Sequence, residues 1–372
     1  MMRAVPRTAV VSARTRRETT RDVDVSRFRR ASGSIRAVVS ARATSETSST
    51  SSPDDEEGAF LTAAAVMGAP TLATLIYPTF FVREGLGLEC ATPLFGETFD
   101  SVRSVQHFSS AFGTSAFSLI ALTALYTLSD AAKNERLNSE TYQRLALAMV
   151  LFVGSFVVAF GGAAASAASG GGGGPNAATC AGLCLAFGPA FATSVKAIRE
   201  HGPGHEETWA RVAKDFKEAT NFGDRTEKGG YLELFYKLSF WTSLVVGGSF
   251  AFSPLSPLAI VNEMEPSSQL IQRAFGLATV FLLAPTQYAL VDASRRGRLG
   301  GGTFKKLNLS IAASIALIDW MTVYTFQAAA DLSPTADDLA AASGGAYNYV
   351  GALAVSASIL AVYLFQGIAA KK

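Results

Sequence analysis

The residue best suited to membrane chemistry in this sequence is Asp319, an acid within the otherwise apolar stretch 307–329. At 1.5 Å per helical residue, Asp319 would lie about 18 Å from Leu307, near the midplane of a bilayer. An unpaired charge is costly there, so such acids are usually functional or paired. Thr322 follows on nearly the same helical face. Two interpretations stay open: the pair binds a transported proton or cation, or a hydrogen-bonded Asp319 joins two helices.

Two further acids, Glu84 and Glu263, recur at equivalent places. Each lies six residues after a proline, Pro78 or Pro257, at the end of an apolar stretch. Together they would frame a polar vestibule, or each would be a solvated acid that follows an interfacial kink. The candidate substrate- or ion-binding residues are therefore Asp319, Thr322, Glu84 and Glu263.

The remaining reactive side chains favour structural roles. Cys180 and Cys184 share a helical face but lack a second ligand pair, and His107 alone is thin support for haem or chlorophyll. No Walker motif, nucleophile elbow or zinc-protease motif is present. Because catalysis needs two or more convergent groups, an enzyme is the less favoured class. We expect no catalytic residue, no metal and no cofactor, although pigment or lipid binding stays compatible with the sequence.

The elements that would position these residues are apolar stretches long enough to cross a hydrocarbon core of about 30 Å. Charged residues make up 17% of the chain and apolar residues 49%, whereas soluble domains carry about 25% charged residues. The sequence therefore predicts an all-α polytopic membrane protein with about eight transmembrane helices, at 59–82, 105–129, 142–165, 178–197, 234–260, 271–291, 307–329 and 347–369.

Loop charge agrees with this count. The loops after the second, fourth and sixth stretches carry most of the cations, for example Lys133, Arg211 and Arg295, whereas the opposite loops show only Arg83, Arg103 and Arg273. This is the positive-inside pattern, and a missed or invented helix would scramble it. Both chain termini are then expected on the basic side.

The stretch Tyr126–Leu147 aligns without gaps over Tyr288–Leu309, with nine identities in 22 positions. The match includes Asp130 with Asp292, Arg136 with Arg298, and Thr141 with Thr303, which favour a structural loop but also suit gating or anion contact. Upstream, with a shift of one residue, Ala111-Phe112-Gly113 matches Ala274-Phe275-Gly276. Since each repeat would hold an even number of spans, we expect two parallel four-helix repeats related by an axis along the membrane normal.

Residues 1–45 contain eleven arginines, many Ser, Thr and Ala, and few acids. This composition is typical of an organellar transit peptide. We expect a plastid (chloroplast) location, in the thylakoid or inner envelope membrane, with a mitochondrial membrane as the alternative. Residues 46–58 resemble a disordered acidic linker.

The predicted domains are the transit peptide, the linker, repeat 1 at 59–197, a charged loop at 198–233 and repeat 2 at 234–372. Within the loop, Trp209, Val212 and Phe216 predict a short amphipathic helix on the membrane surface. The favoured function is a small-solute or ion transporter or channel. The alternative is a non-catalytic scaffold or assembly factor for a plastid photosynthetic complex. The lipid bilayer and other plastid membrane proteins are the expected partners, and no nucleic acid is expected.

Overall fold

A computed structural model describes residues 52–169, 175–223, 226, 229–252, 266–332 and 346–370. The predicted leader 1–45 and the candidate Glu263 lie outside these residues. The described residues form helices joined by loops, and no strand occurs among them. The helices are α2 (Pro53–Ile76), α3 (Pro78–Leu86), η1 (Pro93–Phe95), α4 (Val102–Lys133), α5 (Glu140–Ala168), α6 (Ala177–His201), α7 (His205–Thr220), α8 (Gly230–Phe252), α9 (Pro266–Ala278), the π-helical η2 (Thr279–Leu283), α10 (Ala284–Arg295), α11 (Gly302–Leu332) and α13 (Ala346–Ala369).

Six helical segments of the described residues are long and apolar enough to cross a membrane. They are α2, α4, α5, α6, the continuous segment from Ser267 to Arg295, and α11. The helices α8 and α13 occupy the two other predicted stretches. Of these, α8 carries Glu233 and Lys237 near its start, and the apolar part of α13, Leu353–Ala369, is shorter. The chain is therefore a helical protein suited to a lipid bilayer, and a count of eight spans stays a prediction.

The start and end of α2 follow from local chemistry. Ser52 caps the helix by accepting from the Asp55 amide, while the Asp55 side chain accepts from the Ser52 amide. This capping box extends the helix back to Pro53, so the acids expected in a disordered linker form its first turn. At the other end α2 stops at Ile76, one residue before Tyr77 and the next proline, Pro78. The predicted span 59–82 is thus two helices, because a proline disfavours helical geometry in the residue before it.

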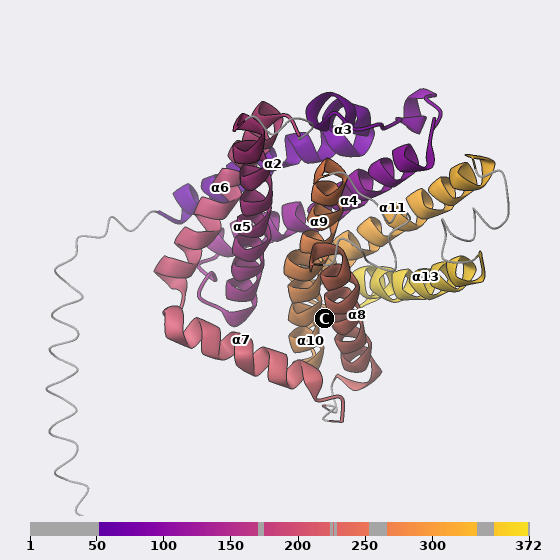
Figure 1. Cartoon of the computed structure of the whole chain (residues 1–372). Helices are drawn as coiled ribbons and strands as arrows, with labels where there is room; N and C mark the ends of the chain where they lie inside the picture. The colour runs from indigo at the N-terminus through magenta and orange to yellow at the C-terminus, as the bar shows by residue number, and fades with distance from the viewer. Residues whose placement is uncertain are drawn as a thin grey trace, which may run out of the picture. The chain divides into compact units, whose positions relative to one another are not determined.

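The helices pack in pairs that are neighbours in sequence, as Figure 1 shows for several of them. α2 packs against α4, α5 against α6, α8 against α9 and α10, and α11 against α13. Contacts between the two halves of the chain include those of α4 with α9, η2 and α11, and those of α5 with the segment α9–η2–α10. The core at these contacts is built largely from Ala, Leu and Phe side chains.

Ion pairs bring one set of helix ends together. Lys133 at the end of α4 pairs with Glu57 in α2, and Arg295 at the end of α10 pairs with Glu233 in α8. Arg296 pairs with Glu140 at the start of α5. We call this end of the bundle the basic end. The amphipathic α7 runs along it from α6 toward α8 (Figure 1).

Candidate functional site

Asp319, the sharpest candidate from the sequence, faces a neighbouring helix. The Ser356 hydroxyl of α13 donates to Asp319 Oδ1 at 2.6 Å, and α11 and α13 lie side by side. Thr322 donates its hydroxyl hydrogen to Ile318 O within α11. The structure thus describes a contact between Asp319 and α13, and none between Asp319 and Thr322.

Of the two candidate glutamates, Glu84 alone lies in the part of the chain that the structure describes. Glu84 lies in α3 with an exposed side chain, and Glu263 falls outside the described part of the chain. The exposure of Glu84 fits a solvated acid at the end of the bundle opposite the basic end.

His107 has both ring nitrogens in hydrogen bonds. Nδ1 lies 2.8 Å from Glu89 O, and Nε2 lies 2.6 Å from the Ser268 hydroxyl of α9. The ring is 6% exposed, so neither nitrogen is free to bind a metal or pigment. This histidine instead joins the start of α4 to the start of α9, which belong to different halves of the chain.

The cysteines are free thiols. Cys90 lies in the loop before α4, where burial raises the pKa of its thiol to about 12. Because the thiolate is the reactive form, Cys90 is inert near neutral pH.

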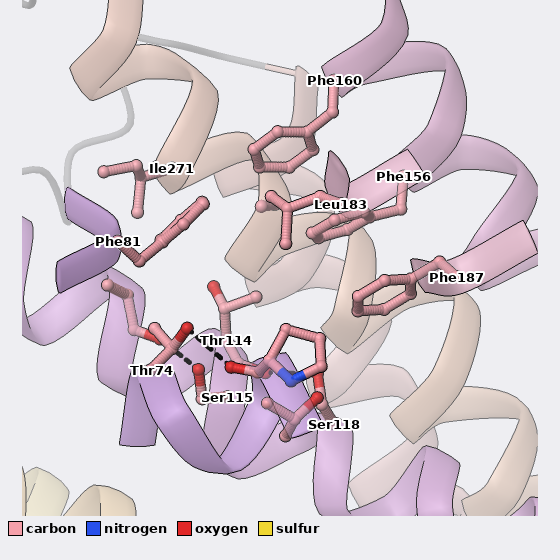
Figure 2. Close-up of a pocket in the computed structure, with 14 residues that line it drawn as sticks. Thr74, Phe81, Thr114, Ser115, Ser118, Phe156, Phe160, Leu183, Phe187 and Ile271 are labelled. Atoms are coloured by element: carbon pink, nitrogen blue, oxygen red, sulfur yellow. Dashed lines mark hydrogen bonds between the residues drawn. The ribbon is translucent and has the colours of Figure 1, made fainter. Parts of the chain in front are cut away.

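A small chamber in the interior of the first half has the residues that suit solute binding (Figure 2). Its volume is about 40 Å³, enough for a few water-sized molecules. Five buried hydroxyl side chains line it, two from α2 and three from α4: Thr71, Thr74, Thr114, Ser115 and Ser118. In Figure 2 the rings of Phe156, Phe160 and Phe187 lie across the chamber from the labelled hydroxyls.

The hydrogen-bond polarity of the chamber is set by the helices themselves. Each of the five hydroxyls donates to a carbonyl four residues earlier, as Thr114 does to Ser110 O at 2.7 Å and Ser118 does to Thr114 O at 3.0 Å. A hydroxyl has one hydrogen to donate and two lone pairs to accept with. The hydroxyl oxygens that line the chamber are therefore acceptors, and they suit a solute that donates hydrogen bonds.

The opposite wall of the chamber is aromatic and tightly packed. Phe156 stacks on Phe160 and on Phe187, with ring centroids 4.3 and 4.7 Å apart. Ile271 and Ala274 of α9 complete the lining, so the chamber also touches the second half of the chain. A water-sized molecule would lie between hydroxyl oxygens and ring faces, the arrangement that orients a small polar solute.

Our sequence interpretation missed this chamber. The signal was present: Thr114, Ser115 and Ser118 share one face of a helix, and Thr71 and Thr74 follow Pro70 on another. Hydroxyl residues in membrane helices usually bond their own backbone, so spacing alone does not distinguish a chamber from ordinary packing. Only the approach of α2 to α4 makes the two sets face one space.

The basic end holds a buried ionic cluster. Glu233 pairs with Lys237 at 2.8 Å and with Arg295 at 2.7 Å, and Glu233 and Lys237 are at most 1% exposed. Arg295 also reaches Glu218 of α7. Arg144 makes two hydrogen bonds to Asp215 of α7, at 2.6 and 2.9 Å. The contacts of Asp215 and Glu218 hold α7 against the bundle. We call the ion pairs among Glu233, Lys237, Arg295 and Glu218 the clamp and assign them a structural role.

One group of side chains at the basic end consists of residue types that commonly bind metal ions. Glu56, Glu200 and His201 place one ligand atom each within 4.8 Å of one another. His201 Nε2 lies 3.1 Å from Glu56, so this contact already joins the end of α6 to the start of α2. Exposed carboxylates gather in this way without a metal, and we assign the group a structural role.

The chain matches no protein-family model, no curated protein and no solved structure. Its function is therefore argued from its own residues.

Proposed function

We propose that the chain is an integral membrane protein with eight spans in two parallel repeats. Matched residues of the sequence repeat make matched contacts, which supports this arrangement. Arg144 lies over the ring of Tyr288, and the equivalent Lys306 lies over the ring of the equivalent Tyr126. Each contact joins one half of the chain to the other.

We further propose that the protein transports a small solute or ion across that membrane, with the chamber as its binding site. The single observation that carries the proposal is the hydroxyl-lined chamber between α2 and α4. The interiors of helix bundles in a membrane are normally filled by apolar side chains, whereas five hydroxyl residues line this space beside the aromatic rings. A plastid membrane is the proposed location, supported by the arginine-rich leader.

Reconstitution into vesicles tests transport directly. The chain from residue 46 onward is inserted into liposomes. Entry of water and urea is followed by light scattering, entry of ammonium by an internal pH dye, and entry of potassium by a potassium electrode. We expect at least one of these four probes to enter faster than into protein-free vesicles. If none of the four probes enters faster than into protein-free vesicles, transport of a small hydrogen-bond donor or cation is refuted.

A matched pair of variants ties any flux to the chamber. Thr114 lines the chamber, whereas Thr123 lies on the same helix and donates to Leu119 O in the same way. Thr114→Val removes one acceptor oxygen, and one hydrogen bond of about 1–1.5 kcal/mol corresponds to about a tenfold slower flux. Thr123→Val should leave the flux unchanged. Equal flux through Thr114→Val and Thr123→Val would show that the chamber is not part of the transport pathway.

A further inference from the structure

A cleft of about 490 Å³ lies at the basic end, between the loop that follows α4 and the loop that follows α10. The first turns of α5 and α11 complete it. Most of its lining comes in pairs at matched positions of the sequence repeat: Arg136 with Arg298, Ser139 with Gly301, Thr141 with Thr303, and Tyr142 with Phe304. The cleft shares no lining residue with the chamber, so its role does not depend on what the chamber carries.

The two loops have the same backbone conformation. Glu135 and Gly297 occupy matched positions, and both are left-handed, with φ of 54° and 66°. The next amide then bonds back to the preceding helix, Arg136 N to Ala131 O and Arg298 N to Ala293 O, each at 2.8 Å. This is a helix-terminating motif that fixes the exit direction of the chain. It therefore delivers the two arginines to equivalent points on either side of the cleft.

The charge of the cleft is positive. Arg136 and Arg298 are exposed, and no carboxylate is among the residues that line the cleft. Within the described part of the chain, neither guanidinium forms an ion pair. The other arginines of these segments, Arg144, Arg295 and Arg296, are each paired with acids. Of the described residues that line the cleft, Arg136 and Arg298 are the only charged ones.

Further donors surround the same space. The hydroxyls of Tyr142 and Thr303 lie 3.0 Å apart and join the two halves beside the cleft. The helices α5 and α11 both begin there, so their first-turn amides and the positive ends of their dipoles add to the field of the arginines. The electrostatic potential from these helix amino termini is positive, as is that of the two guanidinium groups.

We propose that this cleft binds a phosphate group, presented by a soluble phosphate compound or by the headgroup of an anionic phospholipid. Guanidinium forks bind phosphate oxygens with two parallel hydrogen bonds each, and two forks facing one cleft match a tetrahedral anion. Soluble compounds and lipid headgroups meet at the membrane surface, where the basic end lies in the proposed topology. The shared chemistry is a phosphate held between two arginines from different halves of the chain.

Binding of two probes to the purified chain tests the proposal. Titration calorimetry at fixed ionic strength measures inorganic phosphate, and native mass spectrometry counts retained phosphatidylglycerol. We expect at least one probe to bind. The double variant Arg136→Gln/Arg298→Gln should weaken that binding tenfold or more, with each single variant in between. Binding of phosphate identifies a soluble ligand, and binding of phosphatidylglycerol alone identifies a headgroup site.

A charge-matched control separates a site from general attraction. Arg83→Gln/Arg199→Gln removes the same charge from exposed positions outside the cleft and should bind as the unmodified chain does. Melting temperatures of the two double variants should agree, since all four side chains are exposed. The proposal is overturned if neither probe binds, or if the two double variants lose affinity equally.

Discussion

At the scale of single residues, Asp319 is the clearest test of how a half-buried acid in an apolar helix is used. The structure describes one donor to its carboxylate, the Ser356 hydroxyl of the next helix. Asp319 lines neither the chamber nor the cleft, and it is also absent from the lining of an apolar pocket of about 260 Å³ beside α7. Of the two interpretations that the sequence left open, we therefore favour a polar contact that joins α11 to α13.

Substituting Asp319→Asn distinguishes the two interpretations. Asparagine has nearly the same volume and can still accept from Ser356, so abundance, melting temperature and vesicle flux should stay within error of the unmodified chain. Asp319→Val should lower the free energy of unfolding by about 1–2 kcal/mol or less. If flux collapses or loses its pH dependence in Asp319→Asn, the carboxylate belongs to the transport pathway.

Glu233 is the residue whose loss should damage the fold most. Its carboxylate is fully buried and forms ion pairs with both Lys237 and Arg295. Glu233→Ala leaves both cations without this partner, and breaking a buried pair costs about 3–5 kcal/mol. Denaturant titration in detergent micelles measures the loss. As a control, Glu207→Ala breaks an exposed pair with Arg211 and should lower the free energy of unfolding by less than about 0.5 kcal/mol. Equal losses of stability in Glu233→Ala and Glu207→Ala would contradict a structural role for the clamp.

At the scale of elements, glycines set how closely helices approach. α8 and α9 meet at Gly247 and Gly276, where a Cβ on Gly276 would overlap the backbone amide of Ala251. The matched glycine of the first half, Gly113, faces the ring of Phe275, and a Cβ there would lie 2.8 Å from it. Small residues at matched positions thus allow close packing, against the backbone of α8 at Gly276 and against the movable Phe275 ring of the other half at Gly113.

The two glycines should therefore differ in their tolerance of alanine. Gly276→Ala forces α8 and α9 apart and should cost about 1–3 kcal/mol, the range for overpacking. Gly113→Ala should cost less, because the Phe275 ring can shift where a backbone amide cannot. Melting temperatures of the two variants, measured in the same detergent, compare them. A larger loss for Gly113→Ala would contradict the described packing.

At the scale of the whole molecule, contacts place the helix ends in two groups. The basic end gathers α7 and the cation-rich loops, and the other end gathers α3, the loop before α4, and the start of α6, where Asn176 N bonds to Gly85 O. Because cations favour one side of a membrane, these groups should face opposite compartments.

Cysteine labelling tests that topology. In a variant that lacks Cys90, Cys180 and Cys184, one cysteine replaces Lys217 in α7 or Phe95 in η1, both exposed. In sealed vesicles of uniform orientation, an impermeant maleimide should label the two positions from opposite sides. Labelling of both positions from the same side would contradict the proposed eight-span topology.

The amino-acid sequence alone was sufficient to predict the helical class and the approximate positions of the six membrane-length helices. The structural repeat stays a prediction. Apolar stretches of membrane length have few alternatives to a helix, since every backbone amide must be satisfied locally. Proline positions could also be read, although the break at Tyr77 and the capping box at Ser52 moved the predicted limits. The gapless alignment of Tyr126–Leu147 with Tyr288–Leu309 likewise pairs Arg136 with Arg298, because equal spacing along the chain is enough to match them.

Which polar residues meet became known from the packing of the helices. The chamber needs Thr74 of α2 to face Thr114 and Ser118 of α4 (Figure 2). Periodicity within one helix does not specify its neighbour or its rotation. The same holds for Asp319, whose partner Ser356 lies 37 residues away. Sequence patterns record which face of a helix is polar, whereas packing between helices determines whether that face meets a cavity, a partner side chain or lipid.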